Sequence, residues 1–189
     1  MTPMRQWCAD ARAGAAALQA AGAEGRTRAL LAMAQALRAA SGEVLAANAA
    51  DVQAARSRGS DAAFLDRLAL DPARLKALAD GMDAIARQDD PVGVERRRWT
   101  RPNGLEISEV SVPLGVIGVV FESRPNVAAD AAALCVRSGN GVILRGGSEA
   151  SGTVAAIIAA VRAGLRAAGL PDAAVQTPPD ADRGWVTAL

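Results

Sequence analysis

Apolar side chains recur at helical spacing through residues 1–95. Between residues 28 and 52 this pattern breaks near Ser41 and Gly42, where a serine can cap a second helix. A third helix is indicated by Asp71 and Pro72, a capping residue followed by a proline at the first helical position. The apolar face of this third helix consists of Leu75, Leu78, Met82 and Ile85. Residues 1–95 are therefore predicted to form a helical segment.

The pattern changes to alternation beyond the helical segment. Apolar and polar side chains alternate around Trp99 and from Leu105 to Val110. Between these runs, Asn103 and Gly104 form a turn suited to a two-residue hairpin. Residues 96–111 are thus predicted to form a β-hairpin.

An almost continuous apolar run follows at residues 112–121 and predicts a strand that is buried on both faces, as in a parallel sheet. A helix is then expected at residues 127–137 and a second strand at 142–144. Another helix should run through Leu165, before a short strand near 175–177. This order predicts an α/β fold with a Rossmann-like parallel sheet in residues 112–189.

Two polar loops should lie side by side at the carboxyl ends of neighbouring strands, where α/β folds bind ligands. The first loop, residues 122–126, places polar residues and a rigid proline between two very apolar segments. Its Asn126 can donate an amide to a developing oxyanion, and its Arg124 can pair with a carboxylate or a phosphate. The competing interpretation is that Asn126 caps the next helix and that Arg124 lies on the surface.

The second loop, residues 145–149, offers a charge, two glycines, a hydroxyl and a carboxylate where a helix begins. Arg145, Ser148 and Glu149 suit a nucleotide phosphate and ribose, and the glycines permit close backbone approach. The alternative is a glycine turn in which Ser148 is an ordinary helix cap. Neither a GxGxxG nor a Walker motif is present.

Composition narrows the chemistry further. The chain has no histidine, which excludes a histidine base and a His-ligated zinc, and no metal site is predicted. A net charge of +1 gives no field that would recruit nucleic acid or a membrane surface. The uncharged stretches are too short to span a bilayer, and no signal peptide is recognised, so a soluble cytoplasmic protein is expected.

The two cysteines are interpreted as free thiols in a reducing compartment. Cys135 lies among small apolar residues of the predicted helix at 127–137 and is expected to be a buried core residue. Cys8 is expected in a frayed terminus, with no activating neighbour. Neither cysteine is predicted to be a nucleophile.

Long runs of the chain resemble the gamma-glutamyl phosphate reductase family. These runs are Val112-Pro-Leu-Gly-Val-Ile-Gly-Val-Val-Phe-Glu-Ser-Arg-Pro-Asn-Val127, Val142-Ile-Leu-Arg-Gly-Gly-Ser-Glu-Ala150, Ala47-Asn-Ala-Ala-Asp-Val52 and Leu65-Asp-Arg-Leu-Ala-Leu70. The resemblance covers nearly the whole chain. It implies an aldehyde-dehydrogenase-like fold, with N-terminal helices and a hairpin of the oligomerisation type before the sheet, and a homo-oligomeric enzyme.

The resemblance also implies an activity, the NADPH-dependent reduction of L-glutamate 5-phosphate to L-glutamate 5-semialdehyde and phosphate in proline biosynthesis. It assigns oxyanion stabilisation to Asn126 and contacts with the adenosine side of NADPH to Arg145, Ser148 and Glu149. Substrate binding is a further expectation for Arg124. The residues alone leave the cofactor open, because Arg145 can pair with a 2′-phosphate that Glu149 would repel.

One departure from the family pattern is that its catalytic cysteine, in a Ser-Thr-Cys-Asn motif, has no counterpart in this sequence. The chain is therefore expected to be an N-terminal fragment without the catalytic domain. Alone it should be poorly stable and inactive, because it lacks a nucleophile for a thioester. The alternative function is a non-catalytic dinucleotide-binding module.

Overall fold

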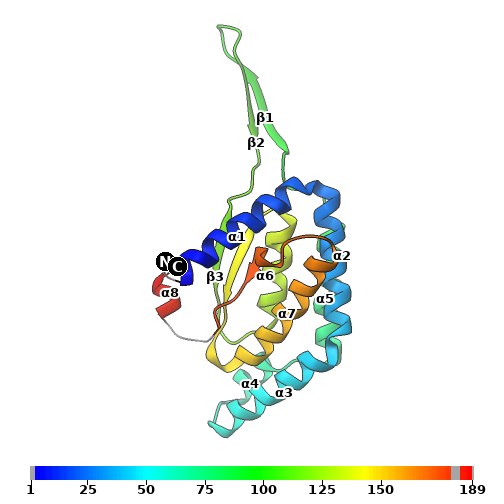
Figure 1. Ribbon diagram of the computed structural model, residues 1–189, viewed down its shortest axis with the longest axis vertical. Helices are drawn as coiled ribbons and strands as arrows, with labels where there is room; N and C mark the ends of the chain where they lie inside the picture. The colour runs from blue at the N-terminus through cyan, green and yellow to red at the C-terminus, as the bar shows by residue number, and fades with distance from the viewer. Residues whose placement is uncertain (1–2, 180–183, 189) are drawn as a thin grey trace.

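The computed structural model describes residues 3–179 and 184–188, so residues 1–2, 180–183 and 189 of the predicted outer segments lie outside the described residues. Helices come first, an antiparallel hairpin follows, and a parallel sheet with its own helices completes the order (Figure 1). The elements are α1 (Pro3–Ala20), α2 (Gly22–Ala39), α3 (Ser41–Ser57), α4 (Ala62–Leu68), α5 (Pro72–Ala86), β1 (Glu95–Thr100), β2 (Glu106–Val110), β3 (Val116–Val120), α6 (Asn126–Arg137), β4 (Gly141–Arg145), the 3-10 helix η1 (Ser148–Ala150), α7 (Ser151–Ala167), the 3-10 helix η2 (Asp172–Ala174), β5 (Val175–Gln176) and α8 (Gly184–Ala188). The α/β fold class predicted from the sequence is confirmed, while the domain limits at residues 95 and 111 stay predictions.

The starts of the N-terminal helices test the capping predictions. The cap at α5 is confirmed, because the Asp71 carboxylate accepts a hydrogen bond from the Arg74 amide at 2.6 Å and Pro72 follows it. The predicted cap by Ser41 is wrong, since Ser41 is itself the first residue of α3 and no side chain caps that helix. The expected frayed terminus around Cys8 is also wrong, because Cys8 lies within α1.

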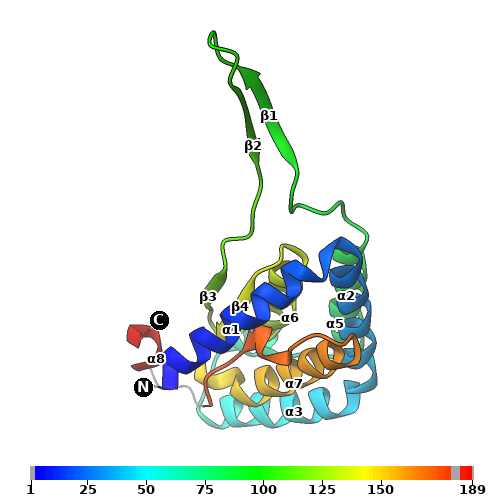
Figure 2. The same ribbon diagram turned by 45° about the horizontal axis from the view of Figure 1, so that its top comes forward.

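The hairpin of β1 and β2 projects from the rest of the protein as a narrow arm (Figures 1 and 2). Trp99 pairs with Ile107 in an antiparallel register. Residues 101–105 separate the two strands, so the predicted two-residue turn is too short. Gly104 has φ +84°, a conformation that glycine adopts at little cost, and this accounts for its place in the longer turn.

The parallel sheet has the strand order β3-β4-β5, and β4 is its central strand. Helix α1 covers one face, while α6 and α7 cover the other. Successive β4 side chains alternate between these faces: Val142 and Leu144 pack into the main helical core, and Ile143 packs towards α1. The helix α1 lies close to the sheet because Gly141 has no side chain; a Cβ there would lie 2.5 Å from the Ala11 carbonyl oxygen.

The prediction of a long strand buried on both faces at residues 112–121 is wrong in two respects. The strand β3 covers only Val116–Val120, and it is an edge strand of this sheet. Val112 and Leu114 precede it with exposed fractions of 75% and 85%, and Val120 is 52% exposed. A continuous apolar run indicates a strand but does not specify which of its faces other elements will cover.

Residues Ser148–Ala167 have the length and composition of a membrane-spanning helix, which the sequence prediction had not recognised. Half of this segment is buried, and α7 packs against α2 and α3. The contact with α2 is very close, since a Cβ on Gly164 would lie 2.4 Å from the Met33 Cα. This segment is therefore a buried core helix.

Candidate functional site

The two loops predicted to carry chemistry do lie together at the carboxyl edge of the sheet. Val120 of β3 pairs with Arg145 of β4, and the Phe121 amide donates to the Arg145 carbonyl oxygen at 3.0 Å. Beyond the strands, the Ser123 hydroxyl donates to the Glu149 carboxylate at 2.7 Å. One side-chain hydrogen bond therefore joins the loop after β3 to the helical turn after β4.

This hydrogen bond also sets the ionisation of Glu149. The bond from Ser123 is the largest influence that holds the pKa of Glu149 below its ordinary value, and partial burial opposes it. Ser123 is itself buried. Glu149 is accordingly a carboxylate at neutral pH, held towards the loop after β3.

The two glycines of the second loop have a packing role that the sequence did not predict, while their predicted role in ligand access stays a prediction. A Cβ on Gly146 would lie 3.0 Å from the Phe121 ring, and one on Gly147 would lie 2.3 Å from the Ser123 hydroxyl oxygen. Both glycines therefore allow the loop after β3 to pack against the loop after β4. Gly146 and Gly147 line a cleft as well, but packing within the protein already requires them.

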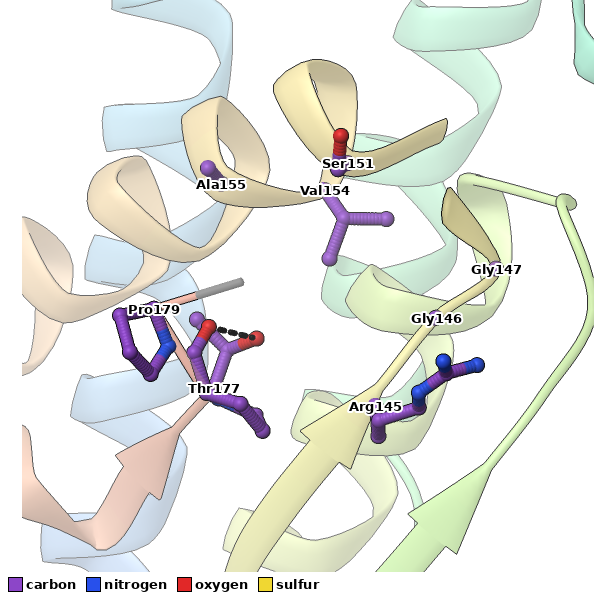
Figure 3. A pocket seen from close by; sticks show the side chains of 9 residues that line it. Arg145, Gly146, Gly147, Ser151, Val154, Ala155, Thr177 and Pro179 are labelled. Carbon is purple, nitrogen blue, oxygen red and sulfur yellow. Dashed lines mark hydrogen bonds between the residues drawn. The ribbon is translucent and has the colours of Figure 1, made fainter. Parts of the chain in front are cut away.

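A small cleft of about 60 Å³ opens between the end of β4, the first turn of α7 and the segment after β5 (Figure 3). Its polar side chains are Arg145, Ser151 and Thr177. Ser148 and Glu149 do not line it, so the structure brings only Arg145 of the three predicted cofactor residues to this cleft. Its volume is well below the several hundred Å³ of typical ligand pockets, so it suits one part of a ligand.

The start of α7 is held by a residue that sequence analysis missed. The Asp51 carboxylate, on α3, accepts hydrogen bonds from the Thr153 amide at 2.7 Å and the Thr153 hydroxyl at 2.6 Å. The alternative in which Ser148 caps the helix is wrong, because no side chain caps η1. Asp51 already occupies this positive helix end, and Arg145 is the charged side chain that lines the cleft beside it.

Asn48 extends this buried connection to the turn between α4 and α5. Its amide nitrogen donates to the Leu68 carbonyl oxygen at 2.9 Å and to the Thr153 hydroxyl at 3.2 Å. Its amide oxygen accepts from the Leu70 backbone amide at 2.7 Å. A signal was available in the sequence, because Asn48 and Asp51 are polar residues one helical turn apart in an alanine-rich helix.

Asn126 is the first residue of α6, and its side chain does not cap that helix. Its amide nitrogen instead donates to the Asp130 carboxylate, one turn later, at 3.3 Å. Burial raises the pKa of Asp130, and the bond from Asn126 partly offsets this. The capping alternative is thus excluded, and Asp130 orients the amide of Asn126.

Arg124 lies in the loop after β3 with its side chain half exposed. Its closest carboxylate is Glu122, at 3.6 Å, an exposed pair of little energetic weight. Arg124 and Asn126 both line a cavity of about 340 Å³ that faces the turn between α4 and α5. The structure therefore separates the predicted site residues into two groups, one beside Arg145 and one beside Asn126.

The cysteines have unlike surroundings. Cys135 is buried on α6, and burial raises the pKa of its thiol to about 11. This bears out the prediction that Cys135 is a buried thiol, and a raised pKa disfavours its thiolate. Cys8 is partly exposed on α1, and within the described residues no three side chains are grouped as metal ligands would be.

The chain is similar in sequence to proteins of one enzyme family. No family model matches the chain. Gamma-glutamyl phosphate reductase from Afipia carboxidovorans is 53% identical over 98% of the chain, and that from Caulobacter vibrioides is 56% identical over 93%. These matches cover 44% and 43% of the two relatives, so the chain spans less than half the length of the curated proteins it matches.

Solved structures agree with the sequence comparison. Gamma-glutamyl phosphate reductase from Thermotoga maritima superimposes with a TM-score of 0.93 at 34% identity, over 98% of this chain and 45% of that one. The Saccharomyces cerevisiae protein gives 0.88 at 31%, over 97% and 47%. An acetylating aldehyde dehydrogenase from Geobacillus thermoglucosidasius, at 15% identity and a TM-score of 0.69 over 95% of this chain and 37% of that one, shares the fold. In sequence and in fold, the chain corresponds to the N-terminal portion of the gamma-glutamyl phosphate reductase family, whose fold is that of aldehyde dehydrogenases.

Proposed function

We propose that this chain forms the cofactor-binding part of a cytoplasmic gamma-glutamyl phosphate reductase. The reaction is reduction of L-glutamate 5-phosphate to L-glutamate 5-semialdehyde and phosphate, a step of proline biosynthesis. The observation that carries the proposal is the junction of the two loops by Ser123 and Glu149. This junction places a cationic cleft at Arg145 on one side and the amide of Asn126 on the other.

The proposed cofactor is NADPH, with its adenosine side at Arg145 in the cleft and with Ser148 and Glu149 as contacts outside the cleft. The cleft fits a phosphorylated ribose in its chemistry, because the Arg145 guanidinium and the Ser151 hydroxyl can donate to phosphate oxygens, and the Thr177 hydroxyl can do so by leaving its long 3.5 Å bond to the Pro178 carbonyl oxygen. Glu149 would repel a 2′-phosphate if it lay in the cleft, but Ser123 holds it outside. This favours the phosphorylated cofactor over NADH. NADPH, when bound, would supply the hydride.

Asn126 is proposed to donate to the oxyanion that develops on the substrate carbonyl. Its amide is a neutral donor at every pH, and Asp130 fixes its orientation through one of the two amide hydrogens. The other hydrogen remains available for substrate. Arg124 is proposed to pair with the substrate phosphate near the same loop.

These residues bind and orient, but the described part of the chain offers no suitable nucleophile. The Cys135 thiol is buried with a pKa of about 11, which makes its thiolate scarce at neutral pH. Cys8 lines a separate cavity with Arg12 and Val116, and not the cavity beside Asn126, so the thioester step needs a cysteine that this sequence does not hold. For the 189-residue chain alone, binding without turnover is expected.

A chimera tests the proposal directly. The chain would replace the matching segment of the Caulobacter vibrioides reductase, and NADP⁺-dependent oxidation of L-glutamate 5-semialdehyde in phosphate would be followed by absorbance. The chimera should turn over substrate, whereas the chain alone should not. If the chimera binds the dinucleotide but does not turn over substrate, the result would support the alternative function, a non-catalytic dinucleotide-binding module.

The adenosine site is tested with half-cofactors on the chain itself. We expect 2′,5′-ADP to bind more tightly than 5′-AMP, since the 2′-phosphate adds a charge-assisted pair with Arg145. Arg145→Ala should weaken 2′,5′-ADP about 10- to 100-fold and 5′-AMP much less, as measured by ³¹P NMR titration. Arg101→Ala, at the exposed tip of the hairpin, is the matched control. Equal losses for both nucleotides would remove Arg145 from this role.

A further inference from the structure

The larger cavity next to Asn126 has a wall that nothing above assigns to a function. This wall consists of the end of α4, the turn after it and the start of α5, and its Asp66, Arg67 and Arg74 line a cavity of about 340 Å³ together with Arg124 and Asn126. That volume lies at the lower end of the range for small-molecule sites. The cavity therefore has room for one amino-acid-sized ligand.

The turn is fixed before any ligand arrives. Arg74 donates to the carbonyl oxygens of Asp66 and Ala69 at 2.7 and 3.0 Å, and to the Asp66 carboxylate at 2.7 Å. Asn48 holds the same turn from the interior through its bonds to the backbone of Leu68 and Leu70. A wall with its hydrogen bonds already made loses little entropy when it binds a ligand.

The charges of the cavity favour an anion. Three arginines, Arg67, Arg74 and Arg124, line the cavity together with one acidic residue, Asp66. Asp66 already pairs with Arg74, and Arg124 lies 3.6 Å from the exposed Glu122 in a contact of little energetic weight, so Arg67 and Arg124 are the cations that remain for an anionic ligand. Arg67 forms no ion pair within the described residues; its guanidinium lies 6.0 Å from the centre of the Phe64 ring.

The two cationic sides of the cavity differ in what they adjoin. Arg124 belongs to the same loop as Asn126, where the reacting carbonyl is proposed to lie. Arg67 belongs to the opposite wall. Leu70 and Leu78 also line the cavity and offer an apolar surface for methylene groups.

We propose that this cavity selects an acidic α-amino acid derivative, with its α-carboxylate on Arg67 and its terminal acyl phosphate beside Arg124 and Asn126. This rests on the proposed function, to which it adds the orientation of the substrate and a specificity-determining residue, Arg67. Arg74 acts as a positioning residue, because it bonds the last turn of α4, which carries Arg67. The substrate's aliphatic segment lies against the leucines.

Direct binding to the whole chain is the first test. L-glutamate, 4-aminobutyrate and glutarate would be titrated by saturation-transfer NMR, since 4-aminobutyrate lacks the α-carboxylate and glutarate lacks the ammonium group. L-glutamate should bind at least about tenfold more tightly than 4-aminobutyrate, and Arg67→Gln should abolish the difference. Arg56→Gln, an exposed arginine on α3 that lines no part of the cavity, should change nothing. Equal binding of L-glutamate and 4-aminobutyrate, or no L-glutamate binding, would overturn the proposal.

The chimera provides the second test and separates this proposal from the first. Arg67→Gln should raise KM for L-glutamate 5-semialdehyde about 10- to 100-fold and leave KM for NADP⁺ within about twofold. If the chimera is active and Arg67→Gln leaves both constants unchanged, the cavity proposal fails while the proposed function stands. If the unsubstituted chimera is inactive, the proposed function fails, and the binding titration still decides the role of the cavity.

Discussion

The strands β3 and β4 are both apolar and pair in register, yet they differ in burial. Residues Gly141 to Leu144 of β4 are buried, whereas β3 exposes Gly118 and Val120. Helix α1 lies over β4 but leaves a cavity of about 370 Å³ above β3, lined by Cys8, Arg12, Val116, Gly118, Val120 and Ile143. Burial in this sheet is thus conferred by the covering elements and not by the strand sequences alone.

The largest expected effect tests this difference in core packing. Leu144→Ala on β4 should lower the free energy of unfolding by about 2–5 kcal/mol, because a fully buried side chain leaves a cavity. Val120→Ala on β3 should cost less than about 1 kcal/mol, since that side chain is half exposed. Urea denaturation measures both. Ile143→Val, at about 1 kcal/mol, serves if Leu144→Ala does not fold; equal losses on the two strands would contradict the comparison.

A second prediction concerns the helix that follows β4. Asp51→Ala should cost about 2–3 kcal/mol, because it leaves the buried amide and hydroxyl of Thr153 without their charged acceptor. Asp89→Ala removes an exposed carboxylate and is the matched control. Urea denaturation gives the free energies, and hydrogen exchange of the Thr153 amide should accelerate in the Asp51 variant only. Unchanged exchange would show that another group holds the start of α7.

A third and smaller effect is expected at the hydrogen bond from Ser123, in the loop after β3, to Glu149, in the helical turn after β4. Ser123→Ala should bring the Glu149 pKa back towards its ordinary value and cost about 0.5–1.5 kcal/mol at neutral pH. A carboxyl group whose pKa is lower in the folded state than in the unfolded state stabilises the fold at pH values above its unfolded-state pKa. This contribution is lost as the pH falls through the folded-state pKa. The cost should therefore shrink in acid. A ¹³C titration of the Glu149 carboxyl checks the shift, with Ser57→Ala as control; an unmoved pKa would refute it.

The smallest effect concerns the rates at which the two cysteines are alkylated, and it involves no change in stability. Cys8 lines the open cavity above β3, whereas Cys135 is buried in the core that packs on β4. With a pKa of about 11, only about one Cys135 thiol in a thousand is ionised at pH 8. Iodoacetamide at that pH should label Cys8 first, as peptide mass spectrometry would detect. Faster labelling of Cys135 would mean that the core around α6 opens readily.

Local patterns sufficed to predict much of this fold. The Asp71 cap, the β-α-β order and the shared edge of the two loops follow from spacing and from the geometry of parallel sheets. Burial of β3 was not predictable, because it depends on how far α1 extends over the sheet. The extra helix α4 and the longer hairpin turn depend on similar local detail that apolar periodicity does not encode.

The candidate site was predictable in its position but not in its internal contacts. Asn126 and Arg145 were found because their loops follow strands that share one edge. The sequence did not show why positions 146 and 147 need glycine for packing, because the side chains that they contact, Phe121 and Ser123, are distant in sequence. Asn48 and Asp51 stand out in the sequence as polar residues of an alanine-rich helix, but the groups that they contact become known only from the tertiary fold. Arg67 was missed as a site residue for the same reason, because only the fold brings α4 to the loop after β3.

The position of α1 has a consequence for folding during synthesis. This first helix contacts β3, β4, β5 and η2, and the Gln176 side chain donates to the Trp7 carbonyl oxygen at 2.9 Å. A Cβ on Gly14 would lie 2.6 Å from the Ala174 Cα, so the contact requires β5 and η2 to be in place. The ribosome makes α1 before η2 and β5, so the binding surface of α1 is complete only when residue 176 has emerged. Until then α1 is an amphipathic helix without its docking surface, and its docking closes a long loop between α1 and β5.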